Sequence, residues 1–165
     1  MNAGGVFRPG MRAYLVPLIA GAVLVASTFL PWVHVSGMSL AGFPDMLALW
    51  VLGLGVLASL LALLSLITRK NSRHPLLVIG LAALAIMFLS WRIMPQAVGD
   101  RALTIFQANT IVNETPSAEP PVAVVGAGIY LGLLASAAIT AFGLTIVVKR
   151  VAKPYVAADP DDDVE

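Results

Sequence analysis

The chain has 165 residues, of which 59% are hydrophobic and only 12% are charged. Its mean hydropathy of +0.90 excludes an ordinary soluble domain, which needs far more polar surface to cover its core. The net charge of +1 gives no electrostatic reason to expect a nucleic-acid partner. The chain has no cysteine. This excludes disulfides, thiolate nucleophiles and cysteine-based metal sites.

Four apolar runs are each long enough to cross a hydrocarbon core of about 30 Å, which takes about 20 helical residues. None of these runs contains Asp, Glu, Lys, Arg or His. A backbone in lipid must satisfy its own hydrogen bonds, so each run is predicted to be a helix. The predicted fold is an all-α four-transmembrane-helix bundle over residues 13–150, with spans at 13–32, 46–67, 75–91 and 121–148.

The distribution of positive charge predicts the orientation of the bundle. Eight of the ten Lys and Arg residues lie before the first span, between the second and third, or after the fourth. The other two connections contain only Arg92 and Arg101. Because cytoplasmic loops carry the excess of Lys and Arg, both termini are predicted to be cytoplasmic and residues 33–45 and 92–120 to face outward.

Aromatic residues mark the predicted outer ends of the spans. Trp32, Trp50 and Trp91 all fall there, as expected for an aromatic belt at the membrane interface. Arg92 follows Trp91 and is expected to reach the lipid headgroups. The lipid bilayer is therefore the first predicted partner.

The outward connections are predicted to form a small cap with short β elements. Residues 32–40 partly alternate bulky with small or polar side chains around Gly37, which indicates a small hairpin or an extended cap. Residues 102–112 could form a further strand or a short amphipathic helix, and the strand is favoured because their β-branched residues disfavour a helix. Beyond the membrane, residues 1–12 are a cytoplasmic segment and residues 151–165 are expected to be an acidic, disordered tail.

Small residues on the spans predict close helix packing. They recur every four residues on the fourth span and twice on the second, and such ridges allow helices to approach closely. The ridge residues are Gly128, Gly132, Ser136 and Thr140, with Gly55 and Ser59 on the second span. The ridges either seat the protein's own helices or bind a foreign helix or a lipid, so a membrane-protein partner or self-association is predicted.

Two segments resemble those of small bacterial four-helix inner-membrane proteins. The segments are Pro31-Trp32-Val33, Val35-Ser36-Gly37, Ser39 and Gly42 after the first span, and Gly126-Ala127-Gly128-Ile129-Tyr130-Leu131-Gly132-Leu133 in the fourth. The resemblance implies a bacterial inner (cell) membrane location. It implies no particular reaction.

Three classes of function remain open from the sequence. The leading hypothesis is a non-catalytic accessory, scaffold or assembly subunit that binds other membrane components, because the spans lack charge and no catalytic, metal or cofactor motif is present. The alternative is a small oligomeric transporter or lipid-handling protein, for which the hydroxyls of Ser136 and Thr140 are candidates. A membrane enzyme using Asp45, Asp100 or His34 is the third, and no two of these residues have a diagnostic spacing.

Overall fold

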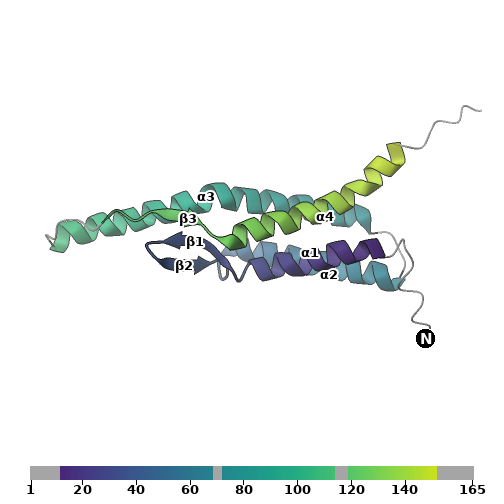
Figure 1. The fold of residues 1–165 in the computed structure, drawn as a ribbon, viewed down its shortest axis with the longest axis horizontal. Coiled ribbons are helices and arrows are strands. Elements are labelled where there is room, and N and C mark those ends of the chain that lie inside the picture. The colour runs from purple at the N-terminus through teal and green to yellow at the C-terminus, as the bar shows by residue number, and fades with distance from the viewer. Residues whose placement is uncertain (1–11, 69–71, 114–118, 152–165) are drawn as a thin grey trace, which may run out of the picture.

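The fold, seen in a computed structural model, combines a helical bundle with a small sheet at one end (Figure 1). Residues 12–68, 72–113 and 119–151 are described, and the predicted acidic tail beyond residue 151 lies outside them. The helices are α1 (Leu15–Ser27), which follows a short 3₁₀ helix η2 (Arg12–Tyr14), α2 (Met46–Thr68), α3 (Arg73–Asn113) and α4 (Ala127–Val151). The strands are β1 (Pro31–Val35), β2 (Met38–Ala41) and β3 (Ala123–Val125).

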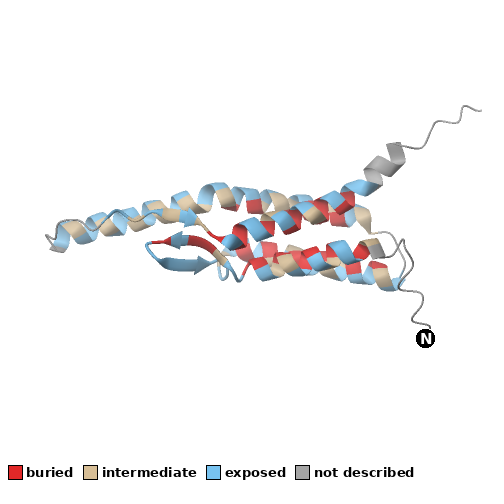
Figure 2. Ribbon diagram, in the orientation of Figure 1, coloured by how far each residue is buried: buried red, intermediate tan, exposed pale blue. Residues whose placement is uncertain are grey.

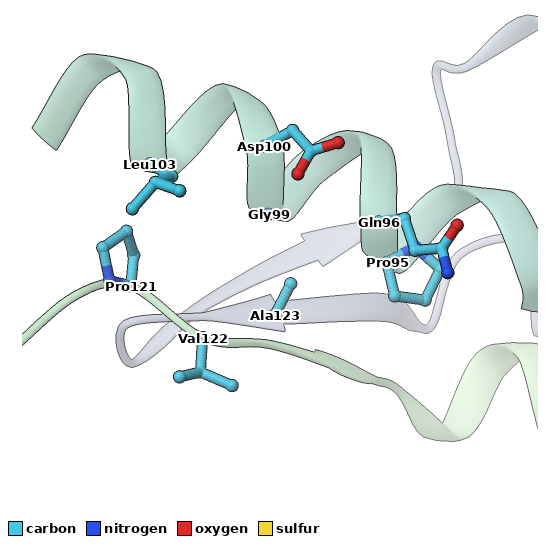
Figure 3. A pocket seen from close by; sticks show the side chains of 8 residues that line it. All are labelled: Pro95, Gln96, Gly99, Asp100, Leu103, Pro121, Val122 and Ala123. Atoms are coloured by element: carbon cyan, nitrogen blue, oxygen red, sulfur yellow. The ribbon is translucent and has the colours of Figure 1, made fainter. Parts of the chain in front are cut away.

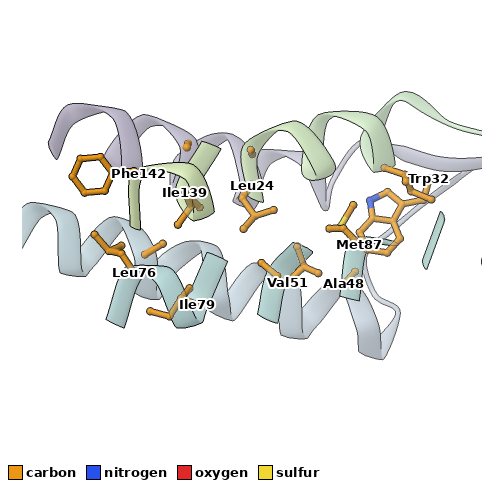
Figure 4. Close-up of a cluster of buried hydrophobic side chains, with 14 of the residues drawn as sticks. Leu24, Trp32, Ala48, Val51, Leu76, Ile79, Met87, Ile139 and Phe142 are labelled. Carbon is orange, nitrogen blue, oxygen red and sulfur yellow. The ribbon is translucent and has the colours of Figure 1, made fainter. Parts of the chain in front are cut away.

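The four helices pack around one apolar core. Helix α1 contacts α2 and α4, and α3 contacts α2 and α4, so the helices form a closed bundle. Leu24, Val51, Met87 and Ile139 are fully buried between them (Figure 4). Buried positions are concentrated in the bundle, whereas the far part of α3 is exposed or half-buried (Figure 2). The prediction of a mostly helical, bundled chain is confirmed.

Three of the described helices, α2, α3 and α4, are long and apolar enough to cross a membrane. Helix α1 is apolar but has only 13 residues. The start of α1, the end of α2 and the start of α3 lie at one end of the bundle with the far end of α4, and the sheet lies at the other (Figure 1).

The largest departure from the sequence prediction concerns α3. Its span was expected to end at Trp91, and for residues 102–112 a strand was favoured over a short amphipathic helix. Instead a single helix of 41 residues continues to Asn113, so the strand prediction is wrong. The hydroxyls of Thr104 and Thr110 donate to the carbonyls of Asp100 and Phe106, each four residues earlier and 2.8 Å away, a bond that a helix readily accommodates.

The first and fourth helices are shorter than the predicted spans. Residues 28–30 continue α1 only as turns with hydrogen bonds to the third residue before, and the chain then becomes extended at Pro31. Helix α4 begins at Ala127 rather than near residue 121, because residues 123–125 pair with β1 as strand β3. Residues 31–32 and 123–125, which were predicted to lie in membrane helices, are therefore part of the cap.

The predicted hairpin is confirmed. Strands β1 and β2 are antiparallel, and Ser36 and Gly37 between them both have positive φ, of 48° and 81°. Two central residues with positive φ are typical of the tight turn that matches strand twist. Strand β3 pairs antiparallel with the other edge of β1, which gives the order β2-β1-β3.

Candidate functional site

Trp32 lies where the sheet joins the bundle, and it is only 1% exposed. Its indole Nε1 donates to the carbonyl of Ser27 over 2.9 Å. The expectation that Trp32 is a lipid-facing anchor is therefore wrong, because an interfacial anchor presents its ring to lipid. Trp32 instead fixes the sheet to the end of α1.

Three glycines make room for this junction. Cβ atoms at Gly42 and Gly128 would press against the indole of Trp32, and one at Gly126 would press against the backbone of residues 31 and 32. The amide of Gly126 also donates to the carbonyl of Trp32 over 2.7 Å. The two segments that carry the sequence resemblance therefore meet in space at this junction.

The small-residue ridges are occupied by the protein's own helices. A Cβ at Gly132 would meet the side chain of Met87 on α3, and one at Gly55 would meet Val25 on α1. Thr140 lies against Gly80 of α3 in the same way. Of the two readings left open by the sequence, these contacts correspond to packing within the bundle.

The hydroxyl groups on the ridges point back to helix carbonyls. Ser136 donates to Leu133 over 3.0 Å, and Thr140 donates to the carbonyl of Ser136 over 2.8 Å. Ser59 donates across to the carbonyl of Leu18 on α1, at 3.5 Å. The hydroxyls of Ser136 and Thr140 are buried, and each donates its proton to a carbonyl of its own helix.

The other predicted anchors lie on the surface of the bundle. Trp50 is exposed on α2, and Arg92 is exposed on α3. Trp91 is half-buried, with its ring 5.7 Å from that of Phe88. These three positions suit the membrane-interface role predicted for them.

The candidate catalytic residues are spread over the cap. Asp45 accepts a hydrogen bond from the amide of Leu47 over 3.2 Å, the geometry of a residue that caps the start of α2. Asp100 lines a hollow of about 550 Å³ between α3 and β3, together with Gln96 (Figure 3). His34 is exposed on β1 and does not line that hollow.

One face of the sheet packs against the outer part of α3. Residues 33 and 35 of β1 alternate with exposed His34 and are buried. Their β2 partners in the register, Leu40 and Met38, lie on the same face but remain exposed. Strand β2 therefore overhangs α3 and leaves an apolar channel beneath it.

We name this channel the cap groove. It consists of two hollows of about 200 and 410 Å³, which follow one another along the seam between α3 and the β1–β2 hairpin. Its walls are apolar, and polar side chains occur at its two ends, with Asp45 near the bundle and Ser36, Asn109 and Glu119 at the far end. The apolar wall residues are Val33, Val35, Met38, Leu40, Met94, Val98, Ala102, Ile105 and Phe106.

The far end of α3 has an exposed apolar tip formed by Ile111 and Val112, each 79% exposed. Residues 103–113 contain no charged residue, whereas an ordinary solvated helix carries charged side chains on its exposed face. Neither the tip nor the cap groove was predicted from the sequence, because a strand was favoured over a helix for residues 102–112. A continuous helical periodicity from residue 94 to 106 was the available signal.

No family model matches this chain, and neither the curated proteins nor the solved structures contain a match. The resemblance to small bacterial four-helix inner-membrane proteins therefore stays a prediction from the two sequence segments.

Proposed function

We propose that the protein crosses a bacterial inner membrane four times, with both termini in the cytoplasm. Helices α2, α3 and α4 meet the length and apolarity that a span requires. The support for orientation is the excess of Lys and Arg in the sequence around the start of α1, between α2 and α3, and around the end of α4, since these helix ends lie opposite the sheet (Figure 1). The sheet and the outer half of α3 then lie on the extracytoplasmic side of this membrane.

Helix α1 completes the set in spite of its length. Its 13 residues rise about 20 Å at about 1.5 Å per residue. The 3₁₀ helix before it and the turns at residues 28–30 add about 2 Å per residue. The whole path from Arg12 to Leu30 thus approaches the thickness of a hydrocarbon core, about 30 Å.

On this placement, the protein is a non-catalytic scaffold or accessory subunit that binds a membrane-protein partner through its cap. The observation that carries this proposal is the projecting α3, whose apolar tip at Ile111 and Val112 is left uncovered outside the bundle. Contiguous exposed apolar patches are typical of interaction sites, and Ile111 and Val112 are adjacent. The internal use of the glycine ridges leaves the cap as the surface for binding.

The test is recovery of a stoichiometric partner after gentle solubilisation of native membranes. Ile111→Asp should lower that recovery about tenfold or more, because burying an Ile side chain contributes about 1.5–3 kcal/mol. Gln107→Asp is the matched control: it adds the same charge one turn earlier on an exposed position but removes no apolar side chain. Recovery of the natural chain only as a lone monomer contradicts the scaffold proposal.

A further inference from the structure

We infer that the cap groove binds the acyl chain of a lipid drawn from the outer leaflet. This inference goes beyond the scaffold function and rests on the membrane placement proposed above. It starts from the overhang of β2, where Met38 is 67% exposed on the face that looks toward α3. Together with the neighbouring residues, it exposes two apolar hollows to water unless a ligand fills them.

The groove has the length of an acyl chain. Its α3 wall runs from Met94 to Asn109, which is about 22 Å at about 1.5 Å per residue. An acyl chain crosses one leaflet, half of a hydrocarbon core of about 30 Å, or about 15 Å. The seam is therefore long enough for a whole acyl chain.

The position of the groove gives access to lipid. Asp45 at its near end directly precedes the first residue of α2, and Met94 follows Trp91 and Arg92 on α3. Asp45 and Arg92 mark the outer ends of the apolar parts of α2 and α3. The groove therefore begins at the proposed membrane surface, next to the outer leaflet from which an acyl chain would enter it.

The chemistry of the walls favours an acyl chain over a peptide. A peptide brings an amide donor and a carbonyl acceptor at every residue, and these need partners when they are buried. Between the two ends of the groove the lining side chains are all apolar. An acyl chain has no such groups, and each methylene that leaves water contributes favourably.

Photolabelling tests the inference with the full chain in vesicles of phosphatidylethanolamine and phosphatidylglycerol. A small fraction of the lipid carries a photoreactive diazirine near the end of one acyl chain. We expect labelled peptides from the groove walls, including Met38 and Phe106, which lie outside the bilayer in the proposed topology. Labels confined to the membrane-spanning parts of α1 to α4 would overturn the inference.

Two variants sharpen this experiment. Ala102→Phe places a ring in the groove and should reduce groove labelling about tenfold, since it displaces about two methylenes. Met38→Gln should also reduce labelling, and its side chain is exposed enough to change without disturbing the fold. Gln107→Phe adds the same ring on an exposed position outside the groove and should leave labelling unchanged.

The outcome is separable from the scaffold proposal and from the topology. Equal labelling of the natural chain and Ala102→Phe, with both folded, overturns acyl-chain binding and leaves partner recovery through Ile111 unaffected. Cysteine accessibility tests the membrane placement by itself.

Discussion

At the scale of single residues, the junction at Trp32 depends on the absence of side chains around it. Gly128 lies in α4, where a Cβ would come within 2.8 Å of the carbonyl oxygen of Ser27 and 3.0 Å of that of Leu30. Backbone oxygens cannot rotate away as a flexible side chain can. The space at Gly128 is therefore fixed by two segments at once.

We expect Gly128→Ala to destabilise the protein by about 1–3 kcal/mol, the usual cost of overpacking a core. Thermal unfolding in detergent, followed by circular dichroism, measures the loss. Gly53→Ala is the matched control, because Gly53 also lies within a helix but has no atom within 4 Å of an added Cβ. Alanine favours a helix more than glycine does, so this control should be neutral or slightly stabilising. Equal effects of the two substitutions would contradict the steric account.

The sequence could not reveal the burial of Trp32. A Pro-Trp pair at the end of an apolar run is compatible with an interfacial anchor. The positions of Trp50 and Trp91 in the structure still suit that role. Trp32 differs from them because Gly42, Gly126 and Gly128 lie around it in the structure. Gly42 is more than 80 residues from the other two glycines in the sequence. That convergence exists only once the sheet has formed.

At the scale of elements, α3 shows how an existing helix overrides local propensity. The β-branched residues of 102–112 each cost at most about 0.7 kcal/mol in a helix relative to alanine. Extending a helix that is already formed through residues 75–91 needs no new nucleus, which is the expensive step. Hydrophobic length predicted α2 well, since its two ends differ little from the expected span 46–67. The same criterion could not locate the end of α3, which lies beyond the lipid.

Asp45 allows a test of its role at the start of α2. As a cap, its carboxylate oxygen accepts from the amide of Leu47, and an asparagine oxygen can do the same. We expect Asp45→Ala to cost about 1 kcal/mol and Asp45→Asn to cost little. Thermal unfolding of both variants measures this difference.

The same pair of variants separates capping from catalysis. An asparagine keeps the hydrogen bond but cannot exchange a proton as a carboxylate does. If Asp45 only caps the helix, the biological phenotype of Asp45→Asn equals that of the natural chain. Loss of the phenotype with unchanged stability would instead support the enzyme hypothesis.

At the scale of the whole molecule, the length of α3 sets the arrangement. A helix of 41 residues is about 60 Å long, twice the thickness of a hydrocarbon core. Its uncharged stretch lies between His74 and Arg92. The part beyond Arg92 therefore projects from the membrane and carries one wall of the cap groove, with the sheet held against it.

This arrangement predicts that two exposed positions on α3 lie on opposite sides of the membrane. The chain has no natural cysteine, so single substitutions report without background. We expect Gln107→Cys to react with a membrane-impermeant maleimide in intact cells, and His74→Cys to react only after the membrane is permeabilised. Ser39→Cys on β2 should behave like Gln107→Cys, because the sheet packs beside the same part of α3. If His74→Cys alone is labelled from outside intact cells, the orientation is the reverse of the proposed one. If all three variants are labelled from outside, α3 does not cross the membrane.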